Sequence, residues 1–519
     1  MLRCVRENPS DFSRQIHAIP PMTDLSTSVY TDCGLKLEAT FVDGTDSPSP
    51  NSQVKLEASL PAPESTSNTQ AKPGLTRKIL TLAVPALGAL VAEPLFTLID
   101  SAMIGHLGTA SLAGLSLASQ ILQTLTILFI FLAYSTTSLT ARALGAKDRR
   151  GAIRAGIDAS WLAALLGLIV AVLLAALAPA LVKLMTTDSS VAHEAVAYLR
   201  ASAPGLIGML IGYSTVGTLR GLQDTRTPLL ITGIGAILNI GLNAVLMFGL
   251  GLGVIGSGLG TSIVQLLMAA VYLSILRREA VSVGAPLRPS GSGIARSALD
   301  GAPLIVRGLA LRLAGLATIW SASQLGSEAL AGYQIVLAIW TLICFVLDAL
   351  AIAAQSMVGL ALGRGKLNEL RELLRILTIW GAGAGVVLGI VITVLSPWIP
   401  FLFDASSSVS PIARWGLIAC CVGMPLGGVV FTLDGVLLGA GDNRYFAIAG
   451  IGQLLVFLPV LGLIELWRLE GAGSIEVVAA AWGAYALVYM GARLATNMWR
   501  TWWSRSGLLG SMDSSLREG

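Results

Sequence analysis

The residues best suited to chemistry in this 519-residue chain are polar side chains inside long apolar segments. Asp100 lies in the apolar stretch Phe96–Gly105, and Glu93 precedes it by about two helical turns, on the same face of a helix. An ionisable side chain at membrane depth costs several kcal/mol, so it is a functional candidate by default. Such a carboxyl either binds and releases a proton or cation, or hydrogen-bonds to hydroxyls of its own helix, such as Thr97 or Ser101.

Two prolines and two asparagines accompany these acids. Pro85 and Pro94 lie in the same apolar segment as Asp100. Because a proline inside a helix removes a hydrogen bond and kinks it, we expect this helix to bend when its carboxyls change charge. Asn239 and Asn243 are one turn apart on one helical face. Their amides would coordinate a cation or hydrogen-bond to Asp100, or else hold neighbouring helices together.

The second half of the chain has acids of its own, Asp348 and Asp434. Asp434 opens the stretch Asp-Gly-Val-Leu-Leu-Gly and marks either a substrate cavity or a loop anchor. Arg307 and Arg312 are expected to form a structural ion pair with Asp348. Uncharged polar residues are expected to line a polar cavity together with the two acids: Gln120, Gln123, Tyr134, Gln334 and Gln355.

The composition predicts that these residues lie in a membrane. The chain is 54% hydrophobic and 12% charged, with a mean hydropathy of +0.75, whereas soluble domains carry about 25% charged residues. The net charge of +4 is too small to indicate a nucleic-acid surface. No metal-ligand spacing and no Walker sequence is present, so we expect neither an enzyme nor a cofactor or metal site. Glycines such as Gly256 and Gly258 are interpreted as turn and packing residues.

Apolar runs of membrane-spanning length predict twelve helices. Their expected extents are 79–104, 111–138, 153–180, 198–220, 228–249, 254–276, 299–323, 330–360, 374–400, 411–438, 446–466 and 475–499. The sequence contains an internal repeat at an offset of 218 residues. Pro85 matches Pro303, and Asp224 and Arg226 match Asp442 and Arg444. Six helices per copy give both copies one orientation, so the symmetry axis should follow the membrane normal.

The chain divides into five predicted parts. Residues 1–73 are rich in Ser, Thr, Pro and acids and are expected to be a disordered tail. Residues 74–278 form the first six-helix lobe, 279–298 a cytoplasmic linker, 299–500 the second lobe and 501–519 a second tail. The tail has neither the apolar core of a signal peptide nor the acid-poor composition of a transit peptide. Met1 and Met22 both remain possible starts.

Basic residues between the spans predict the topology. They gather in alternate loops: Arg142, Lys147, Arg149, Arg150 and Arg154; Arg220 and Arg226; Arg277, Arg278, Arg288 and Arg296; Arg364, Lys366 and Arg371; and Arg444. Because cytoplasmic loops carry an excess of Lys and Arg, these loops and both termini are expected in the cytoplasm. The location that follows is the plasma membrane.

Several segments together resemble the multidrug and toxic compound extrusion (MATE) family, specifically its DinF-like branch. They are Pro85–Pro94, Leu98–Gly108, Ser135–Gly145, Leu219–Pro228, Leu238–Gly249 and Leu433–Asp442. The resemblance covers about residues 75 to 500. It implies a V-shaped pair of six-helix lobes that exports a small, amphiphilic organic substrate, as a monomer in the bilayer, in exchange for H⁺ or Na⁺.

The resemblance also assigns roles to residues. The family's first-helix acid matches Asp100 and its fifth-helix asparagine matches Asn239. Members of the family commonly have Asp at the position of Asn243, so a second carboxylate is missing here unless Glu93 replaces it, and this favours proton coupling. A lipid-linked precursor flippase of the same superfamily is the alternative function. A membrane-embedded enzyme or sensor is disfavoured, because no catalytic domain is present.

Overall fold

The computed structural model describes residues 28–30, 36–41, 54–59, 73–504 and 509, apart from the side chains of the first three of these segments and those of Pro73, Glu93, Phe96 and Leu367. The chain separates into two compact units, Met1–Gln70 and Ala71–Gly519.

The first unit contains a small antiparallel sheet of β1 (Ser28–Tyr30), β2 (Lys36–Phe41) and β3 (Val54–Ser59) in that order. In its register Leu37 lies opposite Ala58 and Phe41 opposite Val54. These three strands differ from the prediction, which expected a disordered tail over residues 1–73. Alternating apolar and polar residues, as in Val-Lys-Leu-Glu-Ala-Ser, favour extended backbone. The rest of residues 1–72 lies outside the described residues.

The first lobe runs from α3 to α10. Its elements are α3 (Pro73–Gly105), α4 (Thr109–Phe129), α5 (Phe131–Gly145), α6 (Arg149–Lys183), α7 (Ser189–Ser202), α8 (Gly205–Gly221), α9 (Arg226–Ala244), the π-helical turn η1 (Val245–Gly249) and α10 (Gly253–Ser282). Asp148 begins α6 by accepting a hydrogen bond from the Gly151 N–H, which satisfies an amide that has no partner within the helix.

The second lobe repeats this order. Its elements are α11 (Gly291–Ser323), α12 (Ser327–Gly363), α13 (Leu367–Leu395), α14 (Ile399–Leu402), α15 (Val409–Val422), α16 (Met424–Ala440), α17 (Asn443–Leu469), α18 (Ser474–Gly483), η2 (Ala484–Tyr489), α19 (Met490–Met498) and η3 (Trp499–Trp503). The helices α10 and α11 extend into the range predicted for the linker, so only residues 283–290 connect the lobes. Ser290 caps α11 by accepting from the Gly293 N–H.

Twelve membrane crossings fit the described helices. Ten helical segments are long and apolar enough to span a bilayer, and two bent pairs pass the same test together. The pairs are α7 with α8, bent by 52°, and α15 with α16, bent by 56°. Each pair is the fourth span of its lobe, so the duplication extends to the broken helix. The prediction of two six-helix lobes is confirmed.

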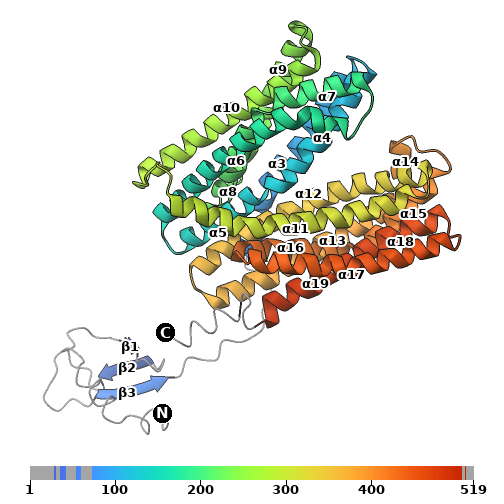
Figure 1. The fold of residues 1–519 in the computed structure, drawn as a ribbon. Coiled ribbons are helices and arrows are strands. Elements are labelled where there is room, and N and C mark those ends of the chain that lie inside the picture. The colour runs from blue at the N-terminus through green and yellow to red at the C-terminus, as the bar shows by residue number, and fades with distance from the viewer. Residues whose placement is uncertain (1–27, 31–35, 42–53, 60–72, 505–508, 510–519) are drawn as a thin grey trace. The chain divides into compact units, whose positions relative to one another are not determined.

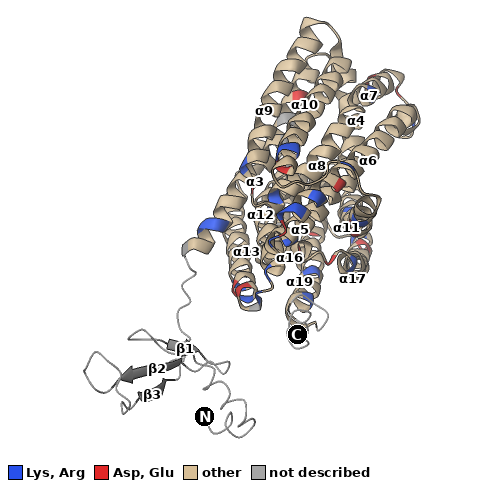
Figure 2. Cartoon of the chain, turned by 90° about the vertical axis from the view of Figure 1, so that its left-hand side faces the viewer, with Lys and Arg blue, Asp and Glu red and all other residues tan. Residues whose placement is uncertain are grey.

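The lobes meet at the helix ends that carry Arg142, Arg220 and Arg364, which we call the basic end. There the Arg142 Nη1 donates to the Ala440 carbonyl at 3.0 Å, and the Ser356 Oγ donates to the Arg220 carbonyl at 2.5 Å. Figure 1 shows the two bundles meeting near α5 and α16 and diverging toward α7 and α14. In Figure 2 the blue segments gather at and below the level of α8.

The first helix belongs to both lobes. Near the basic end, Ile79 and Leu82 of α3 are buried against α12, α13 and α16 of the second lobe. Toward the other end, Ile104 of the same helix is buried in the first-lobe core, with Leu115 of α4. Because one helix packs on both bundles, a change in its shape must move the lobes relative to each other.

Candidate functional site

The first polar cluster lies in the first lobe around Asp100 of α3. Its Oδ1 accepts a hydrogen bond from Asn243 Nδ2 of α9 at 2.9 Å and from Ser257 Oγ of α10 at 2.6 Å. Asp100 is 4% exposed, and Asn243 and Ser257 are fully buried. Three helices thus converge on one carboxyl oxygen, and the predicted contact between Asp100 and Asn243 is present.

A second group of polar residues surrounds this contact. Tyr198 of α7 lies beside Asp100 and Ser257. Asn239, one turn before Asn243, donates from Nδ2 to Thr261 Oγ1 at 3.3 Å. The side-chain oxygens of Asn239 and Asn243 are buried without a hydrogen-bond partner among the described residues. Because a buried acceptor without a donor is costly, these oxygens suit a ligand that brings a proton or a positive charge.

Glycines make this cluster possible. A Cβ added to Gly260 of α10 would collide with Asn243 Oδ1, and one added to Gly258 would lie 3.0 Å from the Tyr198 carbonyl. The sequence analysis expected Gly256 and Gly258 to be turn and packing residues, and the packing role is confirmed for Gly258. Sequence reasoning missed Ser257 and Tyr198. The only available signal was a hydroxyl between two glycines, which indicates a side chain with little space around it.

The first helix also contains the predicted site residues Glu93, Pro85 and Pro94. Glu93 lies in α3, but its side chain is outside the described residues. Pro85 and Pro94 lie inside α3, which remains helical from Pro73 to Gly105. Pro85 lies within the segment of α3 that packs on the second lobe, from Ile79 to Leu90, and Pro94 lies between that segment and Asp100.

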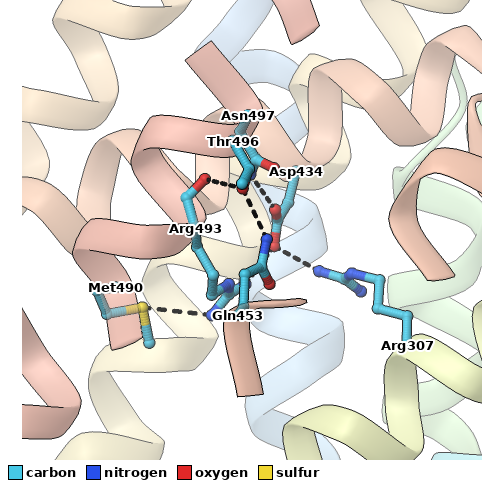
Figure 3. Close-up of polar contacts among 7 residues, drawn as sticks. All are labelled: Arg307, Asp434, Gln453, Met490, Arg493, Thr496 and Asn497. Carbon is cyan, nitrogen blue, oxygen red and sulfur yellow. Dashed lines mark hydrogen bonds and ion pairs between the residues drawn. The ribbon is translucent and has the colours of Figure 1, made fainter. Parts of the chain in front are cut away.

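The second polar cluster lies inside the second lobe (Figure 3). Asp434 of α16 accepts hydrogen bonds on Oδ2 from Arg307 of α11 and Arg493 of α19, and on Oδ1 from Asn497 Nδ2 at 2.6 Å. Aromatic faces cover both guanidinium groups: Arg307 lies 4.6 Å above the Phe446 ring and Arg493 lies 5.6 Å above the Phe431 ring. Asp434 thus links α11, α16 and α19 and does not anchor a loop.

The predicted pairing of Arg307 or Arg312 with Asp348 is wrong. Arg307 pairs with Asp434, and Asp348 of α12 forms no ion pair or hydrogen bond with any described residue. It lies within electrostatic range of Arg307, Arg493 and Arg220. The spacing of charges along the chain gives the face of each helix, but the arrangement of the helices around Asp434 selects the partner.

The uncharged candidates divide into two groups. Gln355 of α12 is buried and donates from Nε2 to the Tyr134 carbonyl of α5 at 2.7 Å, so it joins the two lobes. Tyr134 lies within electrostatic range of Asp348 and Arg307. Gln120 and Gln123 are exposed on α4, and Gln334 is exposed on α12. None of these three hydrogen-bonds through its side chain to a described residue.

Known proteins resemble this chain in sequence and in fold. The family model MatE matches residues 85–245 and 303–463, and the two matches begin at Pro85 and Pro303, the pair found in the internal repeat. Protein DETOXIFICATION 44, chloroplastic, of Arabidopsis thaliana is 32% identical over 82% of this chain and 84% of its own length. DNA damage-inducible protein F of Escherichia coli is 28% identical over 74% of this chain and 86% of its own length.

Solved structures agree in fold. One described as the outward-facing conformation of a multidrug resistance MATE family transporter matches with a TM-score of 0.74 at 20% identity, over 86% of this chain and 97% of the other. At this identity the likeness concerns the fold alone. Together with the family match over both halves, it establishes that the chain belongs to the MATE family of membrane transporters.

Proposed function

We propose that this chain is a secondary active antiporter that exports small organic compounds in exchange for protons. The observation that carries the proposal is the Asp100 cluster, a buried carboxyl on a helix that packs on both lobes. The charged carboxyl is stabilised by the donors of Asn243 and Ser257. The protonated carboxyl has a proton to donate, and the partnerless oxygens of Asn239 and Asn243 are suited to accept it.

The coupling runs through α3. When Asp100 is protonated, it exchanges hydrogen-bond partners. The hydrogen bonds that link α3 to α9 and α10 therefore change. Pro94 interrupts the backbone ladder between Asp100 and the segment packed on the second lobe, so α3 can bend there. A ligand shifts an equilibrium by its differential affinity for the two states. Proton binding that favours one bend therefore favours one arrangement of the lobes.

The charge of the cluster supports protons rather than sodium ions. Asp100 is the one carboxyl among the described side chains of this cluster, and the neutral Asn243 contacts it where the family resemblance implies a second acid. A sodium site prefers several oxygens with negative charge. With one carboxyl, the site exchanges one proton per cycle.

The basic end is assigned to the cytoplasm from its excess of Lys and Arg. Contact between the lobes at that end, with helices diverging toward the other (Figure 1), is the arrangement of a substrate site that faces outward. The flippase alternative shares this architecture.

The membrane that holds the transporter is proposed to be the plasma membrane, with both termini in the cytoplasm. The name of the relative DETOXIFICATION 44 places that protein in the chloroplast, so a chloroplast membrane is the competing location. A fluorescent fusion at the C-terminus, imaged in the source cells beside markers for both membranes, distinguishes the two. The chain is proposed to act as a monomer.

The test of coupling uses the purified full chain in liposomes with separately imposed proton and sodium gradients and a panel of organic cations and anions. We expect a proton gradient to drive transport and a sodium gradient to leave it unchanged. Asp100→Asn keeps the shape of the side chain but cannot titrate, so it should abolish driven transport. Asp404→Asn, at an exposed turn with a φ of 49° that Asn tolerates, is the matched control. Wild-type transport by Asp100→Asn would refute the proposal.

A further inference from the structure

A hollow opens on the first lobe at the helix ends opposite the basic end. It has a volume of about 190 Å³ and is lined by residues near the ends of α3, α4, α7 and α10, among them Leu107, Ser111, His193, Glu194, Ala197 and Val254. His193 is exposed at its rim, whereas Glu194 is half-buried. This volume has room for several water molecules. The excess of Lys and Arg at the basic end assigns the hollow to the outer side of the membrane.

The Glu194 carboxyl is free to exchange a proton. It makes no hydrogen bond or ion pair with any described residue. A Cβ added to Gly114 would lie 2.7 Å from the Glu194 Cβ, so the backbone of α7 is held closely against α4 at this position. Other titratable groups at this end lie elsewhere: Asp188 caps α7, Lys183 ends α6, and His106 lines a separate groove on α3.

One helical turn separates the hollow from the Asp100 cluster on two helices. On α7, Glu194 lines the hollow and Tyr198 follows it by four residues. On α10, Val254 lines the hollow and Ser257 follows it by three residues. Each step is about 5 Å along the helix. Ser257 in turn donates to the Asp100 carboxyl at 2.6 Å.

The layer between the hollow and the cluster is apolar apart from one hydroxyl. Buried Ile104 of α3 and Met247 of η1 belong to one core with Tyr198. Tyr198 also lies beside Asp100, and a Cβ added to Gly258 would lie 3.0 Å from the Tyr198 carbonyl, so α7 and α10 are close at this level. A hydroxyl accepts a proton on its oxygen while it donates its own, so Tyr198 offers a polar route through this layer.

The second copy of the repeat packs the same helices without these polar residues. At the 218-residue offset Glu194 corresponds to Ile412, which is 3% exposed and lies against Gly332 as Glu194 lies against Gly114. The other positions differ in the same way: His193 corresponds to Pro411, Tyr198 to Gly416, Asn243 to Leu461 and Ser257 to Ile475. The helix contact therefore forms with an isoleucine, and the fold of a lobe does not require Glu194.

We propose that this hollow is the outer proton port of the transporter, in which Glu194 takes up a proton from outside and Tyr198 relays it to Asp100. The O–H bond of the Glu194 carboxyl breaks, and its proton passes through water in the hollow to the Tyr198 oxygen. The original hydroxyl proton of Tyr198 forms the new O–H bond on Asp100. Tyr198 is neutral before and after, and the Glu194 carboxylate is reprotonated from the solvent.

The port rests on the proposed proton antiport, because it supplies the carboxyl to which that proposal assigns the coupling. It adds a route that runs within the first lobe, from the hollow to Asp100, apart from the space between the lobes. Proton and substrate then reach the protein by different paths.

The arrival of a proton at Asp100 tests the port without any substrate. The purified full chain in liposomes receives a step to acidic external buffer, and infrared absorption follows the carboxylic C=O band that Asp100→Asn lacks. We expect Glu194→Gln to slow the appearance of this band by about tenfold or more, because it removes the group that takes up the proton. The final amplitude should stay the same, because the Asp100 cluster is intact. Glu470→Gln, exposed at the outer end of α17, is the matched control and should behave as wild type.

Three further measurements separate a relay from a packing effect. Tyr198→Phe keeps the ring and removes the hydroxyl, so it should also slow the band, and adding Glu194→Gln should slow it no further, because both act on one path. Glu194→Asp keeps a carboxyl and should restore most of the rate. External imidazole, a small proton carrier, should speed Glu194→Gln.

Two results would overturn the port. An unchanged rate in Glu194→Gln, shown to be folded by thermal unfolding, would leave the space between the lobes as the route of the proton. Slowing that neither Glu194→Asp nor imidazole relieves would show that Glu194 acts through packing alone.

The same measurement separates the port from the proposed function. Proton arrival at Asp100 that depends on Glu194, without any proton-driven transport, would refute the antiport and leave the port standing. Proton-driven transport that is lost in Asp100→Asn, with unchanged proton arrival in Glu194→Gln, would do the reverse.

Discussion

Gly145 and Gly363, which occupy the same position in the two copies of the repeat, lie against each other at the basic end. A Cβ added to either glycine would lie 2.8 Å from the Cα of the other. The Cβ of Gly145 would also collide with the Leu360 carbonyl, and that of Gly363 with the Arg142 carbonyl. Leu360 and Arg142 are again repeat partners. The lobes therefore close on a nearly symmetric contact of bare backbone.

This contact predicts the effect of a bulky residue. Gly363→Leu forces α5 and α12 apart, and overpacking of about 1–3 kcal/mol shifts the balance toward states open at the basic end by about tenfold. The measurement is maleimide labelling of Ser356→Cys in inside-out vesicles, which should become faster. Gly383→Leu in α13, where a Cβ meets no atom within 4 Å, is the control. Equal labelling rates in both variants would contradict the closure role.

Asn243→Asp should change the coupling ion. It places a second carboxyl at the Asn243–Asp100 contact of 2.9 Å, and two like charges so close require a shared proton or a bound cation. We expect transport to become stimulated by a sodium gradient in liposomes. Asn368→Asp, at the exposed start of α13, should leave transport independent of sodium. If transport by Asn243→Asp does not respond to a sodium gradient, a second acid does not select the coupling ion.

Asp434→Asn should destabilise the second lobe. It leaves Arg307 and Arg493 buried without a carboxylate, and breaking a buried pair costs about 3–5 kcal/mol. Thermal unfolding of the detergent-purified protein should show a lower Tm. Adding Arg307→Gln removes one stranded charge, so the double variant should unfold at a higher temperature than Asp434→Asn alone. Additive losses would show that the two residues are not coupled.

The topology predicts which loops react from outside. Cysteines introduced as Lys147→Cys or Arg371→Cys should resist an impermeant maleimide in intact cells, because both lie in basic loops. Asp188→Cys and Asp404→Cys, in loops at the opposite ends of the helices, should react. Of the described native cysteines, Cys420 and Cys421 are buried and Cys344 is half-buried, so labelling of the unsubstituted protein sets the background. Labelling at Lys147→Cys would invert the assigned orientation.

Deletion of residues 1–70 should leave transport unchanged. The deletion removes the whole first compact unit, Met1–Gln70, and leaves every helix of both lobes. A sheet of three short strands is marginally stable by itself, so we expect the fold of the lobes not to require it. Transport by the truncated protein in liposomes, normalised to the amount inserted, is the measurement. Lost transport at normal insertion would assign the tail a role in the cycle.

The sequence by itself predicted the membrane class, the duplication and the contact between Asn243 and Asp100. Hydropathy determines the spans because each one must satisfy its backbone inside the bilayer. The offset between Pro85 and Pro303 predicted two equivalent lobes. The spacing of Asn239 and Asn243 placed both amides on one helical face, and Asp100 was the evident acid for them to meet.

Tertiary structure alone decided which helices are neighbours. Ser257 joins Asp100 across 157 residues of chain, and Arg307 binds Asp434 across 127. Helical periodicity gives the face of a side chain but not the helix that lies opposite, because that depends on how ridges and small residues pack. For this reason Asp348, the expected partner of Arg307, is unpaired among the described residues, and Arg307 binds Asp434 instead.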